Sequence, residues 1–473
     1  MGPITTVAGG YAYFEEFMNL ERGGFAPRYY RLDRMERLLA DFGDPHLAYE
    51  TIHVAGSKGK GSVCAFAGSI LAASGRRVGI YASPHVSDYR ERVRVLSRCP
   101  ADDEAGNLPA DDLSDALLIE QFERVRHYAD KLSENTPEAE LPTTFELLTL
   151  FAFLVYEAAG CDAAVIEVGL GGRLDATNVV RPSVGIITPI ELEHTDYLGN
   201  TIGLIAKEKA GIIKDGMKLF VAPQYPDALE AILLAAAEHG VTATCVQPRE
   251  QIDTVSVGFG GTDVSLRFDE MAIKTHLRLL GRFQAENAVL ATNAVRAAVP
   301  TLTDVEIERG LRAAWLPGRL EVIPGSPTVI IDGAHTTRSV QVLLDTIEEL
   351  AIPYEQRVAV FGAVAGKNHR GMVELLAPHF SRMVIARPGT FKKSDTHALL
   401  DLCREYHQAC ELHDEIDDAL EAASDGRLVA ALQPAAGNGT GLIVVTGSLY
   451  LAGDARHALL PGRDPRPVIE GCP

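Results

Sequence analysis

The sequence has few of the features that mark exported, membrane-spanning or nucleic-acid-binding proteins. Its seven cysteines form no C-x-x-C pair, so neither a zinc site nor a disulfide framework is expected, and reduced thiols are typical of a cytoplasmic protein. It has no signal-peptide-like segment and no apolar run of membrane-spanning length. Lysine and arginine (44) are outnumbered by aspartate and glutamate (64), giving a net charge of −20. That charge repels polyanions, so neither nucleic acid nor an anionic membrane is expected as a partner.

The length, composition and hydrophobic pattern of the sequence are typical of large α/β domains. It has 473 residues, of which 47% are hydrophobic and 23% charged, enough for two or three domains with full cores. Apolar strand patterns alternate with helical ones, which is typical of a mostly parallel sheet. We expect strands around Ile52 and Val54 and at 78–82, 163–168, 183–188 and 219–221. We expect helices at 11–20, 30–41, 63–73, 117–133, 145–159, 202–213, 226–239, 284–299 and 304–313.

Two stretches do not continue this alternation of strands and helices. Residues 254–278 alternate and contain three glycines, which predicts a small antiparallel sheet. After Leu316-Pro317-Gly318 a fresh βαβ series begins, with strands at 328–331, 357–362, 383–386 and 442–446 and helices at 339–350 and 399–408. We therefore predict an ATP-binding P-loop domain at 1–318 and a smaller, Rossmann-like α/β domain at 319–473.

The glycine loop after the first strand is the main candidate for chemistry. Residues 56–62 have the spacing G-x-x-G-K-G-S between a strand and a helix. Glycines let backbone amides converge on phosphate oxygens, and the helix N-terminus adds partial positive charge. Lys60 supplies a full charge, and the Ser62 hydroxyl suits phosphate or Mg²⁺. The general P-loop has an earlier glycine where Val54 stands, so a plain glycine-rich turn is the alternative.

Three further candidates follow strands, at the edge of a parallel sheet where ligands bind. Ser83 precedes Pro84, Glu167 ends an apolar strand, and His194 lies in the loop after the next strand. A buried, unpaired carboxylate is costly, so Glu167 favours a metal partner. The alternatives are a turn serine, a surface acid and a simple hydrogen-bonding histidine. Lys209, taken alone, is typical of a solvated helix face.

Taken in order, these pieces resemble one family. The chain resembles the folylpolyglutamate synthase/dihydrofolate synthase branch of the Mur ligases from about residue 30 to 456. The motifs that carry the resemblance are residues 56–62, Ser83-Pro84-His85, Phe145-Glu146, 167–178, His194, 208–211, Gln284 with Asn287, Pro317-Gly318-Arg319, 332–335 and 447–450. The resemblance implies that ATP phosphorylates the carboxylate of a folate or dihydropteroate, and that the amine of L-glutamate then attacks the acyl phosphate. A cytoplasmic monomer is expected.

The resemblance also implies a role for each site residue. Lys60, Lys209 and His335 would be catalytic, with Lys209 carbamylated. Two Mg²⁺ ions would be bound, one by Ser83 and Glu167 and one by His194, and a monovalent cation is a further expectation. The phosphates would be held by Lys60 and the loop around it, namely Ser57, Lys58, Gly59, Gly61 and Ser62. Asn287 would contact adenine, and Arg319 and Asp332 would contact phosphate or ribose. Ser448 would contact glutamate. The pterin pocket would be formed by Thr143, Thr144 and Phe145, with Phe145 stacked on the ring.

The chain departs from the family pattern at three places. Thr336-Thr337 replaces Asn-Pro, Gly366-Lys367-Asn368 replaces Asp-Lys-Asp, and Phe283 replaces the histidine before Gln284. Two of these lie in the second domain, which would bind the amino acid. The alternatives are a Mur-type ligase with another acceptor or amino acid, a non-catalytic ATP-binding homologue, and a simple P-loop kinase. A cell-wall Mur ligase is disfavoured because only about 55 residues precede the loop, less than an ordinary domain.

Overall fold

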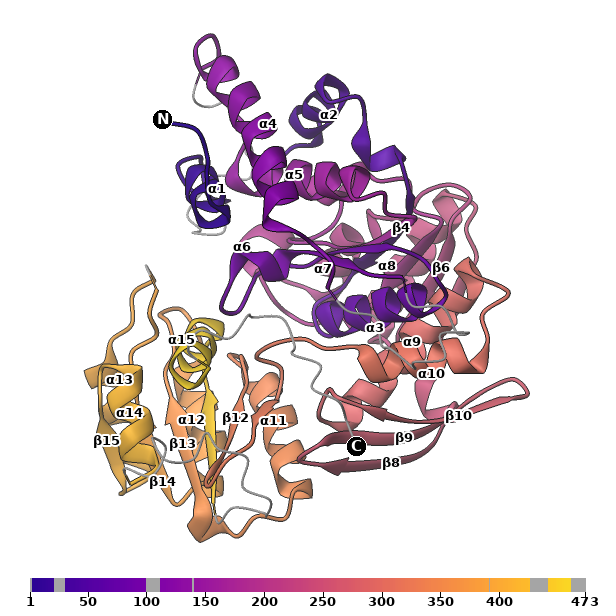
Figure 1. Ribbon diagram of the computed structural model, residues 1–473. Helices are drawn as coiled ribbons and strands as arrows, with labels where there is room; N and C mark the ends of the chain where they lie inside the picture. Colours follow the sequence, from indigo (N-terminus) through magenta and orange to yellow (C-terminus); the bar gives the residue numbers. More distant parts are fainter. Residues whose placement is uncertain are drawn as a thin grey trace.

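The computed structural model describes residues 2–20, 30–98, 111–137, 140–390, 392–425 and 441–460. Within these ranges the strands form three sheets (Figure 1). Two of the sheets belong to the part of the chain before Gly318, which we call the large lobe. The third belongs to the described residues from Gly318 onward, which we call the small lobe. Residues 314–320, between a helix of the large lobe and a strand of the small lobe, form the linker.

The central sheet of the large lobe has seven strands in the order β3-β2-β4-β1-β5-β6-β7. Every neighbouring pair is parallel except β2 with β3, so the expected parallel sheet is confirmed. Burial on both faces explains the continuous apolar runs in these strands. Their bounds are β1 Glu50–Ala55, β2 Val78–Tyr81, β3 Val93–Leu96, β4 Ala163–Glu167, β5 Val184–Ile187, β6 Lys218–Val221 and β7 Ala243–Cys245.

Helices cover both faces of this sheet. One face packs against α3 Lys60–Ala73 and α9 Arg282–Ala298, and α10 Asp304–Ala313 packs on α3; all three helices share one apolar cluster. The other face packs against α5, whose buried positions lie on all its sides because it also contacts α4 and α1. The remaining helices of the large lobe are α1 Val7–Phe14, α2 Leu32–Asp41, α4 Asp115–Ser133, α5 Thr144–Ala158, α6 Thr195–Leu198, α7 Ile202–Ala210 and α8 Pro226–Glu238.

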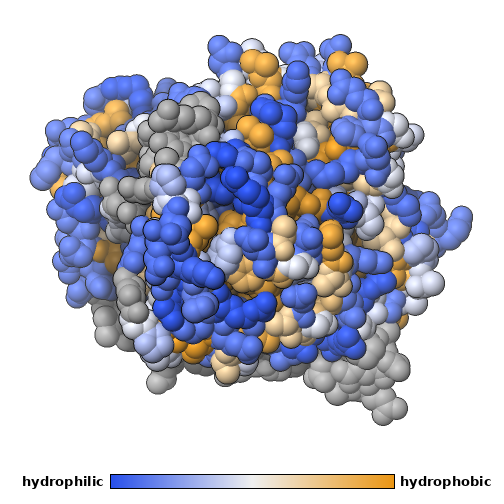
Figure 2. Space-filling view, turned by 90° about the horizontal axis from the view of Figure 1, so that it is seen from above, coloured by the Kyte–Doolittle hydropathy of each residue, from blue (hydrophilic) through white to orange (hydrophobic). Residues whose placement is uncertain are grey.

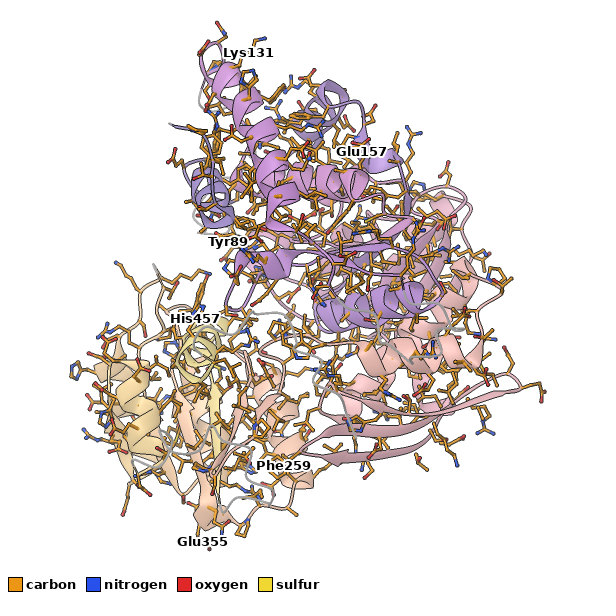
Figure 3. The ribbon with its side chains drawn as sticks, viewed as in Figure 1. Tyr89, Lys131, Glu157, Phe259, Glu355 and His457 are labelled. Atoms are coloured by element: carbon orange, nitrogen blue, oxygen red, sulfur yellow. The ribbon has the colours of Figure 1, made fainter. Side chains whose placement is uncertain are left out.

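The expected antiparallel sheet is present and reaches toward the small lobe. It consists of β8 Ile252–Gly258, β9 Gly261–Phe268 and β10 Met271–Leu277. Phe259, at the turn between β8 and β9, packs against the apolar cluster of the small lobe. Figure 3 labels this residue where the sheet meets that lobe.

The small lobe has a six-stranded sheet in the order β11-β12-β16-β13-β14-β15. All neighbouring pairs are parallel except β11 with β12. Its strands are β11 Glu321–Ile323, β12 Thr328–Ile331, β13 Arg357–Phe361, β14 Arg382–Ile385, β15 Cys410–Leu412 and β16 Leu442–Thr446. Two apolar clusters cover its faces, and they include residues of α11 Thr337–Glu349, α12 His369–Leu376, α13 Thr396–Tyr406, α14 Ile416–Ala423 and α15 Leu449–Leu459.

One expected helix is misplaced. The helix expected at 11–20 runs instead over Val7–Phe14, and the side chain of Thr6 caps its first turn by accepting from Gly9 N. Two adjacent glycines, Gly9 and Gly10, concealed its first half, because glycine disfavours helices. Residues 15–19 form a turn, a bend and irregular backbone, with no α-helix. The short strands β3, β7, β11 and β15, and the helices α12, α14 and α15, were not expected.

The topology gathers the candidate loops at two facing edges. Ser83, Glu167, the glycine loop and His194 follow β2, β4, β1 and β5, which are adjacent strands. Parallel strands end at one edge, so all four loops share it. In the small lobe, Asp332 and Ser448 follow the adjacent strands β12 and β16 in the same way.

Among the helices of the described ranges, none combines the length and the apolar character needed to cross a membrane. On the face shown in Figure 2, hydrophobic residues are scattered among hydrophilic ones, which is ordinary for a folded surface.

Candidate active site

The glycine loop has a backbone that only glycine fits at two positions. Gly56 has φ +142° and Gly59 φ +86°. A Cβ on Gly56 would overlap the Thr188 hydroxyl, and one on Gly59 would lie 2.7 Å from Asn287 Oδ1. The Asn287 side chain therefore lies against the loop, where its amide donates to Gln284 Oε1 at 3.0 Å.

Fewer amides of the glycine loop are free of backbone partners than the sequence suggests. Ser57 N and Lys58 N both donate to Pro189 O, at 3.0 and 3.2 Å, so these two amides are already occupied by the loop after β5. Helix α3 begins at Lys60, and its first i→i−4 bond runs from Val63 N to Gly59 O. The amides of Lys60, Gly61 and Ser62 therefore precede the intrahelical bonds and form the exposed donor end of α3.

Two lysines converge behind the glycine loop. Lys60 Nζ donates to Gly56 O at 3.1 Å and lies 4.0 Å from Glu167 Oε1. Lys209 Nζ donates to the same carbonyl at 2.8 Å and to Glu193 Oε1 at 3.0 Å. Lys209 is 2% exposed, so the solvated helix face suggested by its neighbours is wrong. Burial lowers the pKa of Lys209 to about 8, and the charge of Lys60 acts in the same direction.

Glu167 and Ser83 are in direct contact. Ser83 N donates to Glu167 Oε2 at 3.1 Å. Glu167 is buried, and burial raises its pKa while Lys60 opposes the shift. A buried carboxylate with one amide donor, a neighbouring hydroxyl and a lysine at 4.0 Å has oxygen ligands to spare for a hard cation. The residues present therefore fit Mg²⁺.

His194 stands apart from that pair. Its residue is exposed and adopts φ +49° at the start of α6. Partial loss of hydration lowers its pKa, and the charges of Lys209, Lys60 and Lys367 lower it further. Among the described residues, no group of three or more histidine, cysteine, aspartate and glutamate side chains is gathered as a metal cage.

The small lobe contributes a buried carboxylate at its boundary with the large lobe, and the linker contributes an arginine. Asp332 is buried, and its two oxygens accept from Leu320 N at 2.9 Å and Ala334 N at 2.8 Å. Burial raises its pKa, while the charges of Arg319 and Lys58 lower it. Arg319 also acts on Glu167. The charge of the linker residue Arg319 thus acts on buried acids of both lobes, and the charge of Lys58 acts on Asp332 of the small lobe.

His335 is a neutral imidazole in this site. Its Nδ1 lies 2.8 Å from Gly333 O, and because a carbonyl only accepts, Nδ1 carries the proton. Burial lowers the pKa of His335 to about 3. Its Nε2 therefore offers a lone pair rather than a charge.

Comparisons with known proteins agree with this arrangement. Residues 117–295 match the Mur ligase middle domain and residues 318–449 match the Mur ligase glutamate ligase domain. A dihydrofolate synthase/folylpolyglutamate synthase of Bacillus subtilis is 31% identical over 90% of this chain and 94% of its own length. The folylpolyglutamate synthase of Mycobacterium tuberculosis, solved with ADP, has a TM-score of 0.83 at 28% identity, covering 97% of this chain and 99% of its own.

The chain belongs to the folylpolyglutamate synthase/dihydrofolate synthase branch of the Mur ligases.

The expected family and fold class are thereby confirmed. Another relative is longer than the chain. A probable bifunctional folylpolyglutamate synthase/dihydropteroate synthase of Halobacterium salinarum is 35% identical over 89% of this chain but only 48% of its own length. The chain thus spans about half of that relative.

In this member of the family, three of the residues expected to bind substrates have side chains that form hydrogen bonds within the protein. Ser448 caps α15 by accepting from Tyr450 N at 3.1 Å. Thr143 caps α5 in a capping box with Glu146. Thr144 Oγ1 donates to Phe14 O at 3.0 Å. The two threonine hydroxyls are thus occupied. Phe145 is half-buried beside Gly169 and Tyr81, and its ring remains the candidate contact for a substrate.

The family's altered positions also have structural explanations. Thr336 caps α11 by accepting from Ser339 N, and Asn368 caps α12 by accepting from Gly371 N. Threonine and asparagine are good N-caps, so these replacements keep the helices in place. Phe283 packs against the apolar cluster of the small lobe.

Sequence reasoning missed two acids and a pair between lobes. Glu193 holds Lys209, and Glu191 pairs with Arg338 of α11 at 2.5 Å across the seam. The signal was available in the run Glu191-Leu192-Glu193-His194, where two acids alternate directly after β5.

Proposed function

We propose that this chain is an ATP-dependent ligase that joins L-glutamate to the carboxylate of a folate or a dihydropteroate through an acyl phosphate. The observation that carries the proposal is the meeting of two parallel-sheet edges. Lys60 and Glu167 come from the large lobe, Asp332 and His335 come from the small lobe, and Arg319 acts on both acids. The names of the relatives and the ADP complex support this choice.

The nucleotide belongs at the large-lobe edge. The α3 amides and Lys60 suit the phosphates, because a triphosphate must be neutralised before an anion attacks it. Asn287 would contact adenine, and Arg319 with Asp332 would contact phosphate or ribose. Ser83 and Glu167 would hold Mg²⁺, which when bound supplies positive charge to the phosphate oxygens. A second Mg²⁺ at His194, a monovalent cation and a carbamate on Lys209 complete the proposed site.

Two covalent exchanges make up the reaction. A carboxylate oxygen of the folate attacks the γ-phosphorus of ATP. The bond between that phosphorus and the oxygen bridging to the β-phosphate breaks, and ADP leaves. The glutamate amine then attacks the acyl carbon, and the bond between that carbon and the bridging oxygen breaks. Inorganic phosphate leaves with this oxygen, which came from the folate carboxylate, and takes up the proton that the nitrogen loses. His335 Nε2 would accept a hydrogen bond from the incoming amine. Ser448 would contact the glutamate, and Phe145 would stack on the pterin.

The division of labour follows the two lobes. We propose domain limits of 1–318 and 319–473, supported by the separate sheets and the two domain matches. A cytoplasmic monomer is proposed with them. A non-catalytic homologue is disfavoured because Lys60, Glu167, Lys209 and His335 are all present, and the first three gather at the glycine loop.

One assay tests the function. Phosphate release from ATP is measured with dihydropteroate or tetrahydrofolate, with and without L-glutamate. We expect release that depends on glutamate and on one or both folates. A Lys60→Met variant should lose it, whereas Lys218→Met, at the opposite, amino end of β6, should keep it. Release with no folate, or with no dependence on glutamate, would overturn the proposal.

A further inference from the structure

The segment between β2 and β3, residues 82–92, belongs to the large lobe but is docked on the small lobe. This segment carries Ser83 at its start. Val86 packs against an apolar cluster of the small lobe whose members include Leu451 and Ala455 of α15. A Cβ on Gly453 would overlap Val86 O, so α15 approaches the segment at backbone distance. Figure 3 labels Tyr89 and His457 on the facing sides of this junction.

The docked segment is folded around one carboxylate. Glu91 accepts from Val86 N at 2.6 Å, from Ser87 N and Asp88 N at 3.0 Å each, and from Ser87 Oγ at 2.6 Å. Four donors on one side chain hold residues 86–91 as a single unit. A displacement of that unit must therefore carry along the residues that precede it, including Ser83.

Arg456 of α15 ties this unit to the linker. Its Nη1 donates to Ser87 Oγ at 2.6 Å and lies 3.8 Å from Glu91 Oε1, and its Nε donates to Glu321 Oε2 at 2.7 Å. Glu321 also accepts from Gly318 N at 2.9 Å. The guanidinium lies 5.4 Å from the ring centre of Trp315. One side chain thus contacts the segment, the linker and β11.

The charges of this group are hidden from water. The side chains of Arg456, Glu91 and Glu321 are 7%, 10% and 9% exposed. Removing Arg456 would leave two buried carboxylates that keep their amide and hydroxyl donors but lose their counter-charge, which is unfavourable. The contact is therefore a buried ion-pair and hydrogen-bond group between the two lobes rather than an exposed surface pair.

We infer that Arg456 is a positioning residue for the ligase reaction: it fixes the Ser83 segment and the linker to the small lobe, so that the nucleotide end of the site is set only when the lobes are correctly placed. The inference rests on the proposed function through the role of Ser83 beside Glu167. Arg456 lies two turns along α15 from Ser448, so the same helix borders both ends of the site.

The test uses the chain's single tryptophan. Trp315 is the only tryptophan in the sequence, so its emission reports directly on the Arg456 contact. In Arg456→Met we expect emission at longer wavelength as the ring gains water, and a kcat lower by about ten- to a hundredfold, because displacing reacting groups by an ångström has effects of that size. The KM for ATP should rise more than the KM for the folate. Arg456→Lys should restore part of each change.

A matched control separates positioning from general damage. Arg357 is another buried arginine of the small lobe, paired with Glu348 at 2.5 Å and with Ile352 O. Arg357→Met should lower the melting temperature while leaving the Trp315 emission and the KM for ATP unchanged. Ser87→Ala combined with Arg456→Met should be less damaging than the product of the two single effects, because both changes break the same contact.

Three results of these measurements would overturn the inference. A folded Arg456→Met protein with wild-type kcat and KM for ATP overturns the inference. So does a loss of activity with unchanged Trp315 emission, or one that Arg357→Met reproduces in full. If Ser83→Ala leaves the Mg²⁺ dependence unaltered, the proposed role of Ser83 fails; the emission and Ser87 coupling still decide whether Arg456 joins the lobes.

Discussion

Lys60 and Lys209 share one acceptor, the carbonyl oxygen of Gly56, at 3.1 and 2.8 Å. Two ammonium groups on one carbonyl repel each other unless nearby acids balance them, which Glu167 and Glu193 do here. The arrangement is compatible with two further states. A bound phosphate can draw Lys60 away from Gly56, and a neutral Lys209 removes the repulsion altogether.

Lys209 is therefore expected to react with CO₂ at unusually low pH. With a pKa of about 8, about half of its amine is neutral at pH 8, against roughly 1 in 300 for an ordinary lysine. The neutral amine is the form that adds CO₂, so carbamate should grow as pH rises from 7 to 9. Carbon-13 NMR with labelled bicarbonate measures it, and the signal should be absent from Lys209→Ala.

The neighbouring lysine provides the control for this experiment. Lys207 is exposed on the same helix, and Lys207→Ala should keep both the signal and the activity. Lys209→Ala should lose most of its activity and regain part of it with added short carboxylates such as acetate. Full activity without any addition would refute the carbamate.

Glu167→Gln should weaken the dependence on Mg²⁺ in a measurable way. The amide keeps the shape and still accepts from Ser83 N, but it lacks the charge that attracts the cation. We expect the Mg²⁺ concentration for half-maximal activity to rise by about tenfold, with unchanged folding by circular dichroism. Glu157→Gln, exposed at the end of α5 and labelled in Figure 3, should leave the titration as it is. An unchanged titration in Glu167→Gln would show that the metal lies elsewhere.

Much of this architecture could be predicted from local pattern. Strands β1, β4, β5 and β16 are buried on both faces, so their apolar runs stand out. The antiparallel sheet was visible from its alternation. The edge strands β3 and β11 could not be predicted, because each pairs antiparallel with only one strand and spans four residues or fewer.

The site was harder to predict because its residues owe their state to distant partners. Lys207 and Lys209 look alike in sequence, and only the packing of α7 on the glycine loop buries one of them. Likewise, Thr143 and Ser448 have the same local signature as substrate-binding hydroxyls, yet each caps a helix. Glu91 and Arg456 are 365 positions apart, so no local pattern could pair them.

His335 should not contribute a step to the pH profile near neutrality. Its pKa of about 3 lies below the ordinary value, so the imidazole stays neutral throughout pH 5 to 8. His335→Asn should lower glutamate-dependent phosphate release by about a hundredfold. Acyl phosphate formation, followed by isotope exchange in ATP without glutamate, should persist. A limb near pH 6.5 that disappears in the variant would contradict the neutral assignment.

Phe145 offers a test of the pterin end that is independent of the nucleotide. Its ring is half-buried, 6.1 Å from that of Tyr81, and tight against Gly169, and we propose that it stacks on the flat pterin. Phe145→Leu keeps apolar bulk but removes the aromatic face, whose stacking is worth about 1 kcal/mol. The KM for the folate should therefore rise by about fivefold while the KM for ATP stays constant. Phe145→Tyr retains the ring and should behave like the parent. Equal effects of both variants, or a change in the KM for ATP alone, would place the pterin away from this ring.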